Sequence, residues 1–461
     1  MGDKSILNIF EKAPVPQAVL KNAVPAMTAM LMVLIYNLAD TFFIGQTHND
    51  ILVAAVSLAT PVFLLFLAAG NIFGIGGTSV ISRALGEGRS EYAKKTCSFC
   101  MWVCIVAGAA LSAIFLLFTD QILTLIGASA DTLGPARTYL RIVALGGPFV
   151  LISSSFSNII RAEGQPNKAI TGQLLGNLLN IVLDPVMILF FHWDIAGAAI
   201  ATVIGNAAGA VYYLAYFLQG KSMLSVHIRD FSVKDGICAG VLAIGIPASL
   251  GSLLMSVSHI LINALMADYD DMALAGIGVA MKVTMISSMV CIGLAQGVQP
   301  LLGYCIGAKL WDRFQKIMRF SLAFAFGLSL VMTLLCYLLR NQIVGAFLTE
   351  TAAFDYAVRF TNILLTTSIL FGVFFVFNNA LQAMGAATQA LITNLSRQGI
   401  IYIPALFILQ AAFGVTGLAW AQPVADLLST ALVMVLYFWS SRKLITPNSQ
   451  LNNKTISMDN F

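Results

Sequence analysis

Long apolar stretches separated by short polar breaks run along almost the whole chain of 461 residues. A hydrocarbon core about 30 Å thick requires roughly 20 apolar residues for each helix that crosses it. Stretches such as 53–77 and 320–339 reach that length. The pattern predicts twelve membrane spans, at residues 17–45, 51–80, 96–118, 134–160, 169–191, 195–219, 237–267, 272–305, 317–339, 356–381, 388–411 and 415–440.

A polar segment at 220–236 divides these spans into two sets of six. We therefore expect an N-lobe at 1–219, a cytoplasmic linker at 220–236, a C-lobe at 237–441 and a cytoplasmic tail at 442–461. The expected fold is an all-α integral membrane protein, with twelve transmembrane helices in two six-helix lobes related by pseudo-two-fold symmetry. The N-terminus lacks the short apolar core of a cleaved signal peptide, so we expect the first span to direct insertion.

Composition and charge agree with this interpretation. Hydrophobic residues make up 59% of the chain and charged residues only 10%, whereas a soluble protein has about 25% charged residues. If both termini are cytoplasmic, 19 of the 25 Lys and Arg residues lie on the cytoplasmic side, as the positive-inside rule requires. Cys97 and Cys100 form a CxxC pair, but no second pair or nearby histidine completes a zinc site.

The two sets of spans also resemble each other in sequence. FSNIIRAEGQPNKA (156–169) and FNNALQAMGAATQA (377–390) share five residues at an offset of 221. At nearly the same offset Pro25 corresponds to Pro247, and Gly76 to Gly297. Because six is an even number, both halves have the same topology in the membrane. Parallel repeats of this kind typically place a substrate cavity between two bundles.

Ionisable groups at membrane depth are costly, so each indicates a function or a pairing. Asp40 ends the first span, and Asp184 lies on the fifth span with Asn180 one turn before it. In the second half Asp40 corresponds to an apolar residue, so the polar cluster is specific to the N-lobe. Carboxyl groups in a low-dielectric cavity bind protons more tightly when they lie close together, and such oxygens can also hold Na⁺.

We therefore predict a site for the coupling cation and substrate in the N-lobe. The predicted site consists of Asp40, Asn180, Asp184 and Thr202, with a supporting network of Tyr36, Asn37, Asn158, Asn177 and Asn206 and a helix hinge at Pro25. Na⁺ would use the first four residues. The alternative is a hydrogen-bonded network that only holds helices 1, 5 and 6 together.

Four further ionisable groups lie within spans of the second half. Lys282 and Asp426 are expected to neutralise each other, or else to contact the ligand. Arg397 is expected to extend its side chain to the cytoplasmic interface. His259 is expected to be a packed residue without a chemical role.

The chain resembles the multidrug and toxic compound extrusion (MATE) family over nearly its whole length. The resemblance rests on NLADTFFIG after the proline-bearing first span, ISRALGEGR after the second, FSNIIRAEGQPNKA and NLLNIVLDP. It implies two lobes, a central cavity, and a cation site at Asp40, Asn180, Asp184 and Thr202, with Tyr36 beside it. Helix 7 (GSLLMSVSHILINAL) and helix 10 (FFVFNNALQ) lack the acids of NorM-like members, so the MepA-like and DinF-like branch is the most similar.

Together these observations predict a secondary active antiporter that exports organic cations and drugs in exchange for H⁺ or Na⁺ by alternating access. Its expected partners are lipophilic cationic small molecules and the lipid bilayer, with no nucleic acid and no cofactor besides the coupling ion. We expect a monomer in the bacterial cytoplasmic (inner) membrane. A lipid-linked or oligosaccharide flippase is the alternative. No catalytic triad, metal cluster or nucleotide motif indicates an enzyme.

Overall fold

The computed structural model describes residues 9–47, 49–220, 222–348 and 350–456, and these contain helices but no strand. The helices of the first half are α2 (Val15–Gly45), α3 (Asp50–Gly86), α4 (Ser90–Leu117), α5 (Thr119–Ile126), α6 (Ala130–Leu145), α7 (Gly147–Ala162), α8 (Pro166–Pro185), the π-helix η1 (Val186–Phe190) and α9 (Asp194–Leu218). Those of the second half are the 3₁₀ turn η2 (Ile228–Asp230), α10 (Ile237–Ala267), α11 (Asp271–Gly307), α12 (Trp311–Phe347), α13 (Thr351–Ser368), α14 (Phe371–Ala383), α15 (Ala387–Leu395), the π-helix η3 (Ser396–Ile400) and α16 (Tyr402–Ile456).

Within the described part of the chain these helices form twelve spans. Nine helices are long and apolar enough to cross a membrane, and two bent pairs, α6 with α7 and α13 with α14, add two more. The pairs bend by 56° and 48°. The last of the nine, Ala387–Leu444, contains a break at Gly414, where φ is +59° and ψ is −139°. Because only glycine adopts this conformation readily, the chain turns there and the segment contains two spans, as the sequence predicts.

Several helices extend beyond their predicted limits. The ninth span was expected at 317–339, whereas α12 covers Trp311–Phe347. The short helix α5 between the third and fourth spans was not expected at all. Hydropathy marks only the part of a helix that lies in lipid, so polar turns that continue a helix into water escape it.

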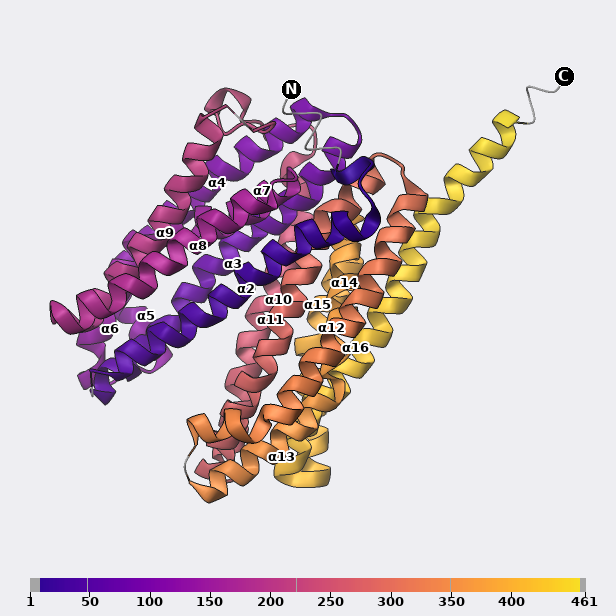
Figure 1. Ribbon diagram of the computed structural model, residues 1–461. Coiled ribbons are helices and arrows are strands. Elements are labelled where there is room, and N and C mark those ends of the chain that lie inside the picture. Colours follow the sequence, from indigo (N-terminus) through magenta and orange to yellow (C-terminus); the bar gives the residue numbers. More distant parts are fainter. Residues whose placement is uncertain (1–8, 48, 221, 349, 457–461) are drawn as a thin grey trace.

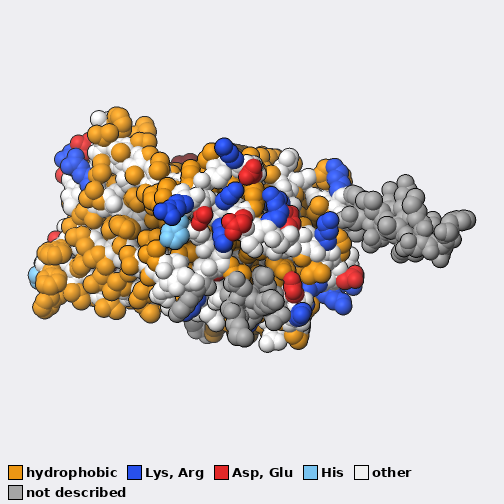
Figure 2. Space-filling view, turned by 90° about the horizontal axis from the view of Figure 1, so that it is seen from above, with side chains coloured by type: hydrophobic (Ala, Val, Ile, Leu, Met, Phe, Trp, Pro, Cys, Tyr) orange, Lys and Arg blue, Asp and Glu red, His pale blue; other side chains and the backbone are white. Residues whose placement is uncertain are grey.

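The two halves form two separate bundles, shown in indigo to magenta and in orange to yellow in Figure 1. The bundles meet at the end that carries the N-terminus and diverge toward the opposite end (Figure 1). Seen from the first end, Lys, Arg, Asp and Glu side chains gather over the middle of the surface, and hydrophobic side chains predominate on the left (Figure 2). Charges at an end and apolar sides are the arrangement that a bilayer requires.

Glycine allows the backbones of the two lobes to approach closely at this end. A Cβ atom added to Gly76 of α3 would lie 2.1 Å from the Val241 carbonyl oxygen of α10. One added to Gly307 of α11 would lie 2.0 Å from the Arg83 carbonyl oxygen of α3. Small residues at helix contacts are typical of membrane proteins, where helices associate through close packing.

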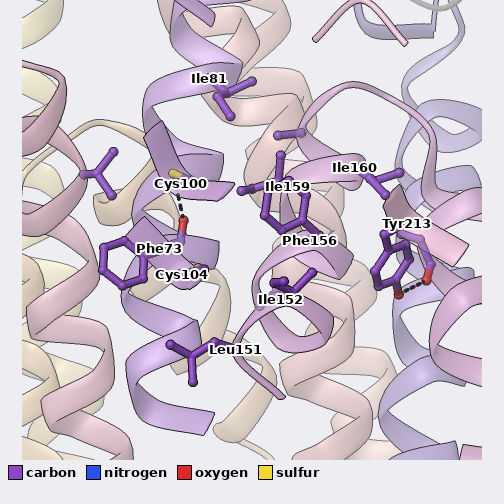
Figure 3. Close-up of a cluster of buried hydrophobic side chains, with 14 of the residues drawn as sticks. Phe73, Ile81, Cys100, Cys104, Leu151, Ile152, Phe156, Ile159, Ile160 and Tyr213 are labelled. Carbon is purple, nitrogen blue, oxygen red and sulfur yellow. Dashed lines mark hydrogen bonds between the residues drawn. The ribbon is translucent and has the colours of Figure 1, made fainter. Parts of the chain in front are cut away.

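The core of the N-lobe is apolar and tightly packed. Figure 3 shows Phe73 and Ile81 of α3 beside Cys100 and Cys104 of α4, with Phe156 of α7 close by. All five are buried. The Cys100 thiol lies 3.6 Å from the Phe73 carbonyl oxygen and donates to it. This core fixes α3, α4 and α7 as one rigid unit behind the polar site.

The segment between the lobes is attached to the N-lobe. Glu163, which is fully buried, accepts hydrogen bonds from the Met223 N–H at 2.7 Å and from the Ser222 hydroxyl at 2.8 Å. The Ser98 hydroxyl and the Trp102 indole donate to carbonyl oxygens further along the segment. Because a buried carboxylate must be hydrogen-bonded, Glu163 holds this segment in place.

Candidate functional site in the N-lobe

Four of the predicted site residues come from three neighbouring helices. Asp40 lies near the end of α2, Asp184 and Asn180 lie at the end of α8, and Thr202 lies on α9. With its amide oriented to satisfy both neighbours, Asn180 donates to Asp184 Oδ2 at 3.1 Å and accepts from the Thr202 N–H at 3.1 Å. The hydrogen-bond network selects this orientation. Asn180 therefore joins α8 to α9 and holds the Asp184 carboxyl group.

Each of the two carboxyl groups has an oxygen without a protein partner. Asp184 is fully buried, and its Oδ1 makes no hydrogen bond within the described residues. Asp40 is half-buried, and its Oδ1 also makes no hydrogen bond within the described residues. The two groups are close enough to interact electrostatically. A pair of carboxylates cannot remain bare in a low-dielectric environment, so this arrangement favours a bound proton or cation.

Two tyrosines complete the polar environment. Tyr36 of α2 and Tyr139 of α6 both interact with Asp40 and Asp184, and both reach the Thr202 side chain. Tyr139 was not predicted as a site residue. It lies in a span whose sequence shows no polar stripe, and only the packing of α6 against α9 brings it to the carboxyl groups.

A cavity of about 120 Å³ lies beside these groups. Its walls include Tyr36, Asn180 and Thr202, whereas neither aspartate is among the described residues that line it. The predicted supporting residues Asn37, Asn177 and Asn206 also line the cavity, and so does Gln173, which the predicted site did not include. A site for one water molecule needs only about 10–15 Å³. The cavity therefore accommodates several waters or a hydrated small cation, but not a drug-sized molecule.

Two predicted residues lie apart from this cavity. Asn158 accepts a hydrogen bond from Arg161 at 2.5 Å and donates to the Ser154 carbonyl oxygen, so it is turned toward its own helix. Arg161 also reaches Gln296 of the C-lobe at 3.3 Å. Pro25 lies inside α2, which continues through it as a single helix. Its role as a hinge stays a prediction.

The C-lobe corrects three expectations. Asp426 pairs with Arg397 at 2.8 Å and not with Lys282, which is exposed and lies over the Phe347 ring. Arg397 is buried and does not extend to the interface. Arg397 lies on the π-helix η3. An α-helix would need a hydrogen bond from residue 404 to the Ile400 carbonyl oxygen, but Pro404 has no N–H, and this loss favours the wider π turn. His259 is exposed on α10 instead of being packed.

Two six-helix lobes that repeat each other, with buried carboxyl groups beside a cavity in one of them, define a multi-pass membrane transporter. The sequence profile of the MatE family matches residues 25–186 and, a second time, residues 247–408. Both matches begin at a proline that the repeat had paired. The chain belongs to the MatE family, whose members are transporters and not enzymes.

Known proteins agree with this assignment. The multidrug export protein MepA of Staphylococcus aureus (strain MRSA252) is 31% identical over 446 residues, which cover 96% of this chain and 98% of MepA. A crystal structure of MATE in complex with MaL6 is 21% identical, with a TM-score of 0.90 over 96% of this chain and 99% of that one. An outward-facing multidrug resistance MATE transporter of the MOP superfamily has a TM-score of 0.89, with 96% and 98% covered. The predicted fold class is confirmed.

Proposed function

We propose that this protein exports lipophilic cationic small molecules across the bacterial cytoplasmic membrane, in exchange for H⁺ or Na⁺, by alternating access. The observation that carries the proposal is the pair Asp40 and Asp184, each with a buried oxygen that has no hydrogen-bond partner among the described residues. The similarity to a multidrug export protein along nearly the whole chain supports export as the direction of transport. An anionic lipid head group would meet like charges here, which disfavours a flippase.

The coupling ion would act by occupying the two carboxyl groups. Empty and ionised, they attract an organic cation to the N-lobe; occupied by H⁺ or Na⁺, they no longer do so. Asp40 is on α2, and α2 also contacts α11 of the other lobe. A change at Asp40 can therefore alter the contact between the lobes. Asn180 and Thr202 would supply the remaining oxygens of a Na⁺ site.

The energy required is modest. One pH unit supplies about 1.4 kcal/mol for each proton, and moving one charge through 100 mV supplies about 2.3 kcal/mol. Exchange of one proton for one monovalent cation moves no net charge, so only the pH gradient would drive it. Such a transporter needs no ATP, and a single chain would suffice for the cycle.

Both termini are proposed to lie in the cytoplasm, as the distribution of Lys and Arg suggests. The end at which the lobes meet then faces the cytoplasm, and the lobes diverge toward the outside. This arrangement suits the step in which the substrate leaves and the coupling ion enters.

Dye efflux from proteoliposomes tests the proposal, with a pH gradient and a Na⁺ gradient imposed separately. Efflux should respond to one gradient, and Asp40→Asn and Asp184→Asn should each reduce it to the level of protein-free liposomes. Asp131→Asn is the matched control, because Asp131 is exposed and far from the cavity in sequence. Full gradient-driven efflux in both site variants would refute coupling in the N-lobe.

A further inference from the structure

The C-lobe contains a cavity that corresponds to the one in the N-lobe. Both have a volume of about 120 Å³. Residues that line them are separated by 220–222 positions, which is the offset of the sequence repeat. The corresponding pairs, N-lobe residue first, are Val33 and Met255, Asn37 and His259, Phe63 and Met285, Leu67 and Met289, Asn177 and Arg397, and Thr202 and Gln422. The two cavities are thus related by the pseudo-symmetry of the fold.

The contents of the two cavities differ in charge. Where the N-lobe has two carboxyl groups with unpartnered oxygens, the C-lobe has a closed ion pair. Arg397 Nε donates to Asp426 Oδ1 at 2.8 Å, and the two side chains are 11% and 2% exposed. The Gln422 amide also donates to Asp426 Oδ1, at 2.9 Å. Asp426 is therefore fully engaged by this lobe.

The Arg397 guanidinium group is surrounded by aromatic rings. Its central carbon lies 5.2 Å from the ring centre of Phe371, 4.9 Å from that of Phe374 and 5.0 Å from that of Phe375. A cation within about 6 Å of ring faces, with a carboxylate as counter-ion, is the arrangement by which proteins recognise organic cations. Arg397 thus occupies the position that a bound organic cation would take.

The remaining walls suit a small organic ligand. Four methionines line the cavity, namely Met255, Met281, Met285 and Met289. Methionine adapts to ligands of varied shape and makes favourable contacts with aromatic rings. Gln398, which also lines the cavity, is 7% exposed, and its Oε1 has no hydrogen-bond partner within the described residues. An unpartnered buried acceptor of this kind is available to a ligand donor.

We propose that the C-lobe holds a second organic-cation site, and that Arg397 is its built-in occupant. By neutralising Asp426 and filling the aromatic cage, Arg397 excludes small free organic cations from this lobe. Cationic substrates and the coupling ion are then confined to the N-lobe. This part of the inference rests on the proposed function, which places both in that lobe. Removing the guanidinium group leaves the cage, the carboxylate and the methionine walls ready for a small organic cation.

Equilibrium titration of the purified full chain with tetramethylammonium, an organic cation small enough for a cavity of about 120 Å³, tests this. Arg397→Met should bind one equivalent more than the unaltered protein. Its affinity for this additional cation should be at least about tenfold higher than that of any second cation that the unaltered protein binds, since cation–π contacts strengthen when desolvated. Adding Asp426→Asn to that variant should remove the extra equivalent. Arg359→Met, which replaces an exposed arginine, should leave the count unchanged.

The inference is overturned if folded Arg397→Met, checked by thermal unfolding, binds the same number of equivalents as the unaltered protein. If that variant is not recovered folded, Arg397→Gln replaces it, because glutamine keeps a hydrogen-bond donor for Asp426. Its number of bound equivalents is then compared with that of the unaltered protein in the same way. The proposed N-lobe function is tested separately, by the gradient-driven efflux of the unaltered protein and its loss in Asp40→Asn and Asp184→Asn. An extra equivalent in Arg397→Met supports the C-lobe site whichever result that arm gives.

Discussion

A close approach of the two lobes at a glycine offers a sharp test of how they move. Gly245 of α10 lies against α3, and a Cβ atom added there would be 1.9 Å from the Ile72 carbonyl oxygen and 2.8 Å from the Ile72 Cα. Both are backbone atoms, so no side chain can turn aside. Gly245→Ala therefore forces α10 and α3 apart. Overpacking of this kind costs about 1–3 kcal/mol, and the cost falls only on the state in which the lobes touch here.

A penalty of that size shifts the balance between two states by about 5- to 150-fold. Cys238 reports the shift, because it is partly buried near the start of α10 and packs against the large core cluster, whereas the other six cysteines are buried. Its rate of labelling by a maleimide should rise with the population of separated lobes. We expect an increase of at least about fivefold in Gly245→Ala.

Gly327→Ala is the matched control, since a Cβ atom at Gly327 of α12 meets nothing within 4 Å. It should label like the unaltered protein and be slightly more stable, because alanine favours a helix over glycine by about 1 kcal/mol. The reasoning fails if Gly245→Ala shows the labelling rate, efflux and thermal stability of the unaltered protein. That result would mean that the added Cβ atom, 1.9 Å from the Ile72 carbonyl oxygen, is accommodated without weakening the contact between α10 and α3.

Two further predictions concern single side chains. Tyr139→Phe should preserve the fold but weaken the apparent affinity for the coupling ion by about two- to tenfold. The change removes a hydroxyl that reaches the Thr202 side chain beside the carboxyl groups, and a hydrogen bond contributes about 0.5–1.5 kcal/mol. The ion dependence of efflux measures this, with Tyr269→Phe at an exposed position as the control, and an unchanged ion dependence would remove Tyr139 from the site. Glu163→Gln should lower the free energy of unfolding by about 1–3 kcal/mol, since the amide cannot accept all three hydrogen bonds that the carboxylate receives. Thermal unfolding checks it against Glu87→Gln at an exposed position, and equal stability of the two variants would show that Glu163 does not hold the segment between the lobes.

The sequence alone determined the spans, the duplication and the pair of acids. A bilayer imposes a length of about 20 apolar residues on each helix and makes every buried charge costly. Hydropathy therefore marks the twelve spans, and Asp40 and Asp184 stand out within them. The duplication is visible for a similar reason, since the glycines and prolines that set helix contacts and bends recur at a fixed offset.

Tertiary structure decided which distant side chains meet. Whether Asp426 faces Arg397 or Lys282 depends on how each helix is rotated about its axis, and the π turn at 396–400 changes that rotation for Arg397. Tyr139 reaches the site only because α6 packs against α9. Periodicity defines the faces of one helix, but the partner of each face is set by packing between helices far apart in the chain. The contents of both cavities therefore became clear only from the folded structure.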